Sequence, residues 1–225
     1  MEFPETTWGL LCSFRPAGPE ERKAGLETLC RRYWEPIRRF VAAAWSLDDH
    51  DARDLTQDFF VWLMEGEVLA RFAPERGSFR AYLKGLLRNY ERNAARAARR
   101  KKRGGDARAV PLDAALPDEK LEEAERAFDR AFALAVTARA IERVERSLQG
   151  KHRVRWELFQ AFDLGDPGTR PSYAELAARH GIKEKDVGNH LQAAREQLRK
   201  EVILELSDTV ASSDDLDEEL RAVTG

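Results

Sequence analysis

The amino-acid sequence predicts an all-α protein built from two small helical domains joined by a linker. Apolar residues recur at intervals of three and four along most of the 225 residues, and no segment shows the alternation of a half-buried strand. Two Gly and two Pro interrupt this pattern within residues 104–120. We therefore expect a helical domain over 1–104, a linker over 105–124, a second helical domain over 125–207 and an acidic tail over 208–225.

Three helices are expected in the first domain. Apolar residues at helical spacing predict one over residues 19–44, and a second begins after residues 48–50. The Ala-Pro-Glu-Arg-Gly segment at 73–77 breaks the pattern, and a third helix follows over 78–102 until two glycines end it.

The second domain is expected to hold four helices. Helical spacing places them over residues 121–148, 153–162, 172–179 and 183–206. A Pro- and Gly-rich break at 166–171 separates the second from the third.

Composition excludes several classes of protein. Cys12 and Cys30 have neither a CxxC spacing nor a nearby His, so neither a disulfide scaffold nor a zinc site is expected. The longest apolar run covers residues 59–64, far short of the ~20 residues that cross a membrane. The N-terminus lacks the features of a secretory signal. We expect a cytoplasmic protein with no membrane partner.

Charge is strongly polarised although the net charge is only −2. Residues 80–103 carry ten cations and one anion, whereas residues 205–225 carry seven anions and one cation. One face of the predicted helix 78–102 carries the cations Lys84, Arg88, Arg92, Arg96, Arg99 and Arg103. Like charges one turn apart destabilise a helix, so a polyanion such as a nucleic-acid backbone is the favoured partner, ahead of a simple solvated face. This interpretation requires that the chain's own carboxylates do not neutralise these cations.

Aromatic side chains interleave with cations just before and within the start of this helix. The aromatic residues are Phe72, Phe79 and Tyr82, and the cations are Arg71, Arg76 and Arg80. The pattern is typical of surfaces that bind single-stranded nucleic acid, where bases stack and phosphates are neutralised. Each ring taken alone is more simply explained as a core residue.

The helix after residues 48–50 carries carboxylates on one face. Asp51, Asp54 and Asp58 lie at i, i+3 and i+7, which suits a protein-binding face or plain solvation equally. The first-turn carboxylates also favour the helix dipole. No His, Cys or Gly-rich loop converges with them, so we expect neither catalysis nor a cofactor or metal.

The last two predicted helices have the spacing of a helix-turn-helix. Ala177, Gly181 and Val187 provide the close helix approach, the left-handed turn and the apolar lock, and Ser172 with Glu175 forms a capping box. The second helix presents polar side chains outward, where its N-terminal half would enter a major groove. These side chains are Lys183, Lys185, Asn189, His190, Gln192 and Arg195.

Together these motifs resemble bacterial RNA polymerase sigma factors of the extracytoplasmic-function (ECF) type, in the sigma-70 family. Residues 51–60, DARDLTQDFF, are similar to the family's region 2 signature. Residues 72–83, FAPERGSFRAYL, and the pair Arg88-Asn89 follow in the family's order, and residues 172–199 look like region 4.

The resemblance implies roles for individual residues. Core polymerase would be contacted at its beta-prime clamp helices and its beta flap, the former by Asp51, Asp54, Gln57 and Asp58. The −10 promoter element would be contacted by Arg76, Ser78, Phe79, Arg80, Lys84, Arg88, Asn89, Arg92, Arg96 and Arg99. The −35 element would be contacted by Ser172, Tyr173, Lys183, Lys185, Asn189, His190, Gln192 and Arg195. The function implied is transcription initiation with strand opening, and an anti-sigma factor or a Ser/Thr kinase is a candidate further partner.

Three positions depart from the family's pattern, and one of them is Ala193, where the family has Arg. Arg53 stands where the family has Glu, and a phosphate on Thr56 beside it would restore negative charge. Gly188 stands where the family has Lys, and Gly within a helix costs about 1 kcal/mol relative to Ala.

Two other functions are open at this level. One is a stand-alone helix-turn-helix transcriptional regulator that binds duplex DNA without polymerase. The other is a helical adaptor whose basic helix binds an acidic protein. The tail over 208–225 is also a candidate competitor for the basic helix.

Overall fold

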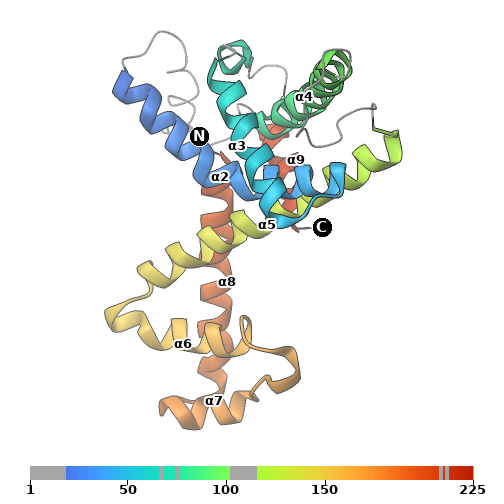
Figure 1. Cartoon of the computed structure of the whole chain (residues 1–225). Coiled ribbons are helices and arrows are strands. Elements are labelled where there is room, and N and C mark those ends of the chain that lie inside the picture. Colours follow the sequence, from blue (N-terminus) through green and yellow to red (C-terminus); the bar gives the residue numbers. More distant parts are fainter. Residues whose placement is uncertain are drawn as a thin grey trace. The chain divides into compact units, whose positions relative to one another are not determined.

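The computed structural model describes residues 19–65, 68–73, 77–101, 116–207, 210 and 213–224. All regular secondary structure in these ranges is helical, which confirms the predicted fold class (Figure 1). The chain divides into two compact units. Unit 1 comprises residues 1–135 and 206–225, and unit 2 comprises residues 136–205.

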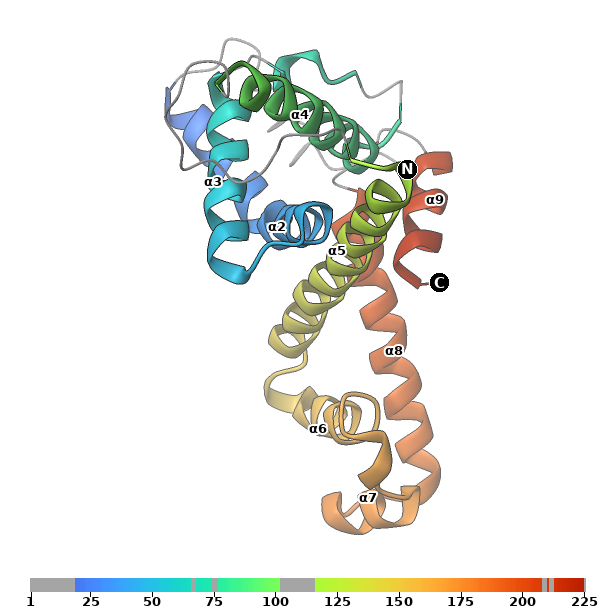
Figure 2. The same ribbon diagram turned by 45° about the vertical axis from the view of Figure 1, so that its right-hand side comes forward.

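Unit 1 is a helical bundle with an aromatic core. Its elements are α2 (Pro19–Trp45), α3 (Asp49–Glu65), the 3-10 turn η1 (Leu69–Arg71), α4 (Phe79–Lys101), the first half of α5 (Asp118–Ser147) and α9 (Ser213–Thr224). Tyr33 of α2 lies at the centre, edge-on to Phe79 of α4 at 5.4 Å and stacked on Phe132 of α5 at 5.6 Å between ring centroids. Figures 1 and 2 both place α9 beside the first half of α5.

The acidic segment between α2 and α3 caps a helix. Ser46 has φ of +54° just after α2, and Asp48 Oδ1 then accepts a hydrogen bond of 2.9 Å from the backbone N–H of Asp51. A carboxylate that accepts from a first-turn N–H satisfies a donor with no partner inside the helix. Asp48 therefore defines where α3 begins.

The first half of α5 is helical because it has an apolar face. Leu121, Ala124 and Phe128 are buried at i, i+3 and i+7, so residues 118–124 form the start of a helix and the prediction of a linker there is wrong. Residues 105–115, the rest of that expected linker, lie outside the described residues. The expected acidic tail contains α9.

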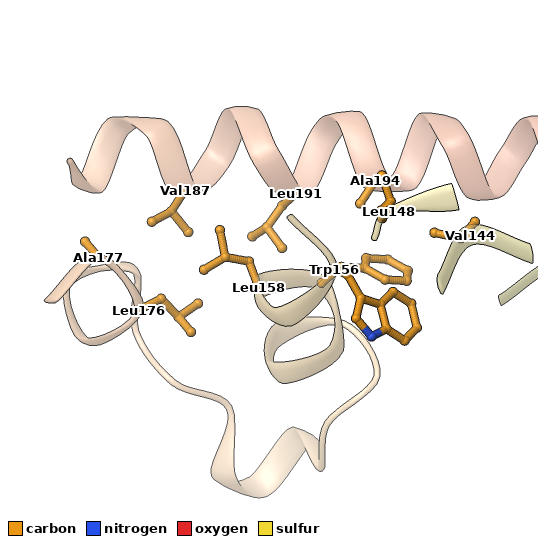
Figure 3. Packing of buried hydrophobic residues seen from close by; sticks show 10 residues of the cluster. Val144, Leu148, Trp156, Leu158, Leu176, Ala177, Val187, Leu191 and Ala194 are labelled. Carbon is orange, nitrogen blue, oxygen red and sulfur yellow. The ribbon is translucent and has the colours of Figure 1, made fainter. Parts of the chain in front are cut away.

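Unit 2 packs four helical segments around one apolar cluster. Its elements are the second half of α5, η3 (Gly150–His152), α6 (Arg153–Phe162), η4 (Pro167–Thr169), α7 (Tyr173–His180) and α8 (Glu184–Ser207) up to residue 205. Figure 3 shows the cluster, in which Leu158 of α6 lies between Leu176 of α7 and Leu191 of α8, while Trp156 lies toward Leu148. Val187, Leu191 and Ala194 of α8 therefore face inward.

An ion-pair cluster also joins α5 to α8 within unit 2. The side chain of Glu205 is 1% exposed, accepts a 2.6 Å hydrogen bond from Arg139 Nε and forms a second ion pair with Arg143. Removing one partner of a buried pair leaves a buried charge without compensation, so this cluster ties α5 to α8.

Candidate functional site

The polar face of α3 is open to solvent. Asp51, Asp54, Gln57 and Asp58 are all exposed, and Ala52, Leu55 and Phe59 on the opposite face are buried. His50 Nδ1 lies 3.6 Å from an Asp54 carboxylate oxygen, at a well-solvated position. The helix thus presents the four predicted polymerase-binding side chains together on its outer surface.

Arg53 does not neutralise this face. Its Nε lies 3.0 Å from Asp49 Oδ2 at the start of the same helix, and Asp49 also pairs with Arg38 of α2. Arg38 is in turn held by Glu35 through hydrogen bonds of 2.8 and 2.7 Å. The guanidinium of Arg53 is therefore directed back along the helix, toward Asp49.

The same surface continues into two apolar residues beyond those that the sequence predicts. Val61 and Met64 are 39% and 46% exposed and lie one and two turns beyond Gln57. The sequence did carry a signal, because the six-residue apolar run 59–64 is longer than one face of a helix can bury. The candidate partner-binding surface of α3, defined as Asp51, Asp54, Gln57, Asp58, Val61 and Met64, is therefore acidic at one end and apolar at the other.

Thr56 lies in the core, so the idea of a phosphate on its hydroxyl is wrong for this structure. Thr56 is 0% exposed, and its Oγ1 donates a 2.7 Å hydrogen bond to the carbonyl of Ala52. A kinase has no access to a hydroxyl in that position.

The start of α4 is more buried than a DNA-binding loop would be. The backbone N–H of Ala81 donates to Ser78 Oγ at 3.2 Å, so Ser78 caps the helix. Phe79 packs edge-on against Phe72 at 5.2 Å and is 1% exposed. Tyr82 donates a hydrogen bond to the carbonyl of Val68. The structure gives Phe79 a core position, and it cannot stack on a base without leaving this aromatic cluster.

Three cations in the first three turns of α4 are paired internally, and two of them belong to the predicted cationic face. Arg80 Nε donates to both carboxylate oxygens of Glu219 in α9, at 2.9 and 2.7 Å, and Arg80 also pairs with Asp129 of α5. Lys84 Nζ lies 3.0 Å from Asp129, and Arg88 pairs with Glu125 one turn earlier in α5. The expectation of an open face is therefore wrong at Lys84 and Arg88, and Arg80, predicted to contact the −10 element, is buried.

Burial and charge act in opposite directions on Arg80. Burial by itself lowers the pKa of this guanidinium, whereas the attraction and hydrogen bonds of Glu219 and Asp129 raise it. The net effect raises the pKa above its ordinary value, so the guanidinium is fully charged at neutral pH. For Arg88, the hydrogen bond to Glu125 is the largest cause of a raised pKa.

The structure describes the remaining predicted −10 residues only in part. Asn89 is exposed on α4, with the apolar face of Leu83, Leu86 and Leu87 buried as predicted. Arg76 lies outside the described residues. Arg92, Arg96 and Arg99 belong to the helical backbone of α4, and their side chains lie outside what is described. Their contacts to DNA stay predictions.

The helix-turn-helix predicted in unit 2 has the expected local geometry. Gly181 adopts the left-handed conformation at φ +64° and closes α7, while the N–H of Ile182 donates to the carbonyl of Ala177 at 3.1 Å. Ser172 and Glu175 form the predicted capping box. Hydrogen bonds from Ser172 lower the pKa of the Glu175 carboxyl. Local sequence signals therefore specify this turn.

The outward face of α8 is largely solvent-exposed. Lys183, Lys185, Asn189 and Gln192 are exposed or half-exposed, as is His190. Arg195 differs from the expectation of a free DNA contact, because Asp163 after α6 binds its guanidinium through hydrogen bonds of 2.9 and 2.8 Å. This bidentate pairing holds the cation against unit 2.

Tyr173 and Gly188 lie next to each other across the turn. The Tyr173 ring packs edge-on to Phe162 at 5.2 Å, and a Cβ atom added to Gly188 would lie 3.6 Å from Tyr173 Cε2. That distance is an ordinary van der Waals contact. The ring of Tyr173, predicted to touch the −35 element, is therefore engaged within unit 2.

Two other kinds of site are absent from the described part of the chain. No cluster of three or more His, Cys, Asp or Glu side chains there is arranged to hold a metal ion. None of its helices combines the length and the apolar character needed to span a bilayer.

Comparison with protein families gives a match over part of the chain. Residues 30–101, from within α2 to the end of α4, match the family model of sigma-70 region 2. No curated protein and no solved structure matches the chain. The match covers about a third of the sequence and contains α3 and α4, which carry the predicted polymerase-binding and −10 residues. Residues 30–101 are therefore similar to region 2 of sigma-70 proteins.

Proposed function

We propose that this protein is a sigma factor of the ECF type, a non-enzymatic subunit that directs core RNA polymerase to promoters in the cytoplasm and helps to open the DNA strands. The observation that carries the proposal is the region 2 match over residues 30–101. Region 2 of sigma-70 proteins supports roles in polymerase binding and promoter melting.

Polymerase binding is assigned to the partner-binding surface of α3. Its four polar residues are exposed to solvent on one face of the helix. Arg53 pairs with Asp49 and does not neutralise their charge. Val61 and Met64 extend the surface with exposed apolar side chains, the type that desolvates well at the centre of an interface. We assign the contact to the beta-prime clamp helices to this surface.

DNA recognition is divided between the two units. The −10 element is assigned to α4 and the −35 element to the outward polar side chains of α8, with unit 2 serving as a region 4-like domain that also meets the beta flap. Asn189 and Gln192 of α8 carry the amide groups that read adenine edges. An anti-sigma factor is a further proposed partner.

The test is transcription with purified core polymerase. The full-length protein is added to core enzyme and a library of promoter fragments, and transcripts are sequenced. We expect start sites that are absent with core alone, together with co-migration of the protein and core enzyme on a sizing column. Transcription no higher than the core-only background would refute the proposal.

Three variants locate the polymerase contact. Asp54→Ala and Asp58→Ala should weaken binding to core, and Val61→Asp should do the same by placing a charge in the apolar part of the surface. Glu142→Ala is the matched control, since this carboxylate is exposed on α5 outside the region 2 match. A stand-alone regulator would instead bind duplex DNA without polymerase and would be indifferent to all four changes.

A further inference from the structure

The first turn of α4 holds a cation that no outside polyanion can reach. The side chain of Arg80 is 8% exposed, and the carboxylate that covers it, Glu219, is 1% exposed. Lys84 and Arg88 are paired with α5 at more exposed positions, with side chains 20% and 49% exposed. One of the two carboxylates that cover Arg80, Glu219, therefore comes from α9, and the other, Asp129, comes from α5.

The face by which α9 docks is charged at its centre. Glu219 is the one buried residue among the described side chains of α9, and Leu216, Leu220 and Val223 around it are half-buried. Buried ion pairs add less to stability than apolar packing of the same volume. A helix with this composition is better suited to reversible docking than to permanent packing in the core.

Charge makes α9 resemble the ligand expected for α4. Residues 213–224 carry five carboxylates and one cation, and the fold places Glu219 among them against the start of the most basic helix of the chain. A carboxylate that accepts two hydrogen bonds from a guanidinium group makes the contact that a phosphate would make at the same place. A helix in the same chain also acts at a high effective concentration.

From this arrangement we propose that α9 is an internal nucleic-acid mimic, which occupies Arg80 and must leave α4 before a single-stranded nucleic acid binds there. The proposal rests on the proposed function, because that function supplies the DNA strand. It gives the protein a closed form, in which Glu219 covers Arg80, and an open form in which Arg80 keeps only its pair with Asp129 of α5 and is accessible to a phosphate.

The test measures binding of the full-length protein to a fluorescein-labelled single-stranded oligonucleotide of mixed sequence, at low salt. Glu219→Gln removes the carboxylate that covers Arg80. Glu218→Gln is the matched control, because this neighbouring carboxylate is exposed and the change in net charge is identical. Deletion of residues 213–225 is the second opening variant, and it exposes Arg80 to solvent instead of leaving its charge buried.

We expect both opening variants to bind at least about tenfold more tightly than the wild-type chain, as follows when less than a tenth of the protein is open. Glu218→Gln should change the affinity far less. Arg80→Gln in the deletion background should abolish the gain. Amide hydrogen exchange over residues 214–223 should be slow in the wild-type protein and should become fast when the oligonucleotide binds.

Two results would overturn the proposal that α9 is a nucleic-acid mimic. One is an equal effect of Glu219→Gln and Glu218→Gln, which would reduce the effect to net charge. The other is tight oligonucleotide binding with the amides of α9 still protected. If the opening variants bind more tightly but no variant supports transcription, the proposed function fails and the mimic stands. If all variants transcribe and bind alike, the mimic fails and the function stands.

Discussion

Replacement of Gly188 by Ala should stabilise unit 2. Gly188 lies in the second turn of α8, and a methyl group added there would have Tyr173 Cε2 as its one neighbour within 4 Å, at 3.6 Å. No clash opposes the change, so the full helix propensity difference of about 1 kcal/mol applies. In a domain of this size, that gain raises the melting temperature by about 4–8 °C.

Replacement of Gly181 by Ala should instead lower the stability of unit 2. Gly181 has φ of +64° and closes α7, although a Cβ there would meet no atom within 4 Å. The left-handed conformation costs an L-residue about 1–2 kcal/mol, so Gly181→Ala should destabilise unit 2 by roughly that amount. The two glycines separate the effect of backbone conformation from that of free space.

The measurement is urea unfolding followed by fluorine NMR of protein labelled with 5-fluorotryptophan. Trp156 is the one tryptophan within residues 136–205, so its resonance reports on unit 2. Assignment comes from Trp156→Phe. Loss of stability in Gly188→Ala, or shifts of the same sign in both variants, would refute the described geometry of the helix-turn-helix.

Three further predictions concern buried groups. Thr56→Glu should destabilise unit 1 by several kcal/mol, because it places a carboxylate in the core, and chemical denaturation measures this. Burial and then the charge of Asp58 raise the pKa of Tyr90 to about 12, so the stability from this neutral phenol is present below about pH 10 and is lost as the pH rises toward 12. Absorbance titration should show a lower Tyr90 pKa in Asp58→Asn, and an unchanged value would contradict the coupling. Glu205→Gln should cost unit 2 about 3–5 kcal/mol, because two arginines lose their buried partner, and a loss below about 1 kcal/mol in urea unfolding would contradict the burial.

Local signals in the sequence predict much of this structure. The helix predicted over residues 153–162 is α6, with the same bounds. The capping box of Ser172 and the left-handed Gly181 are equally local, since each depends on residues within one or two turns. Periodicity also identifies the buried face of α4, where Leu83 and Leu87 are fully buried.

Periodicity does not predict which residues each helix face contacts. Arg80 pairs with carboxylates 49 and 139 residues away, a relation that no local pattern encodes. Its burial is consistent with spacing, because Arg80 and Leu87 are seven residues apart and share a face. The burial of Thr56 is also consistent with spacing. Thr56 lies four residues after Ala52 and three residues before Phe59, on the buried face of α3.

The pair between Arg53 and Asp49 has a consequence for how substitutions in this protein combine. Asp49 holds the guanidinium of Arg53 at 3.0 Å and is itself anchored by Arg38. In a sequence with Glu at position 53, loss of Asp49 would leave the neighbouring carboxylates as they were. Here the same loss frees a cation to swing toward Asp54 and Asp58, so the effect of a change at position 49 is epistatic with the residue at position 53.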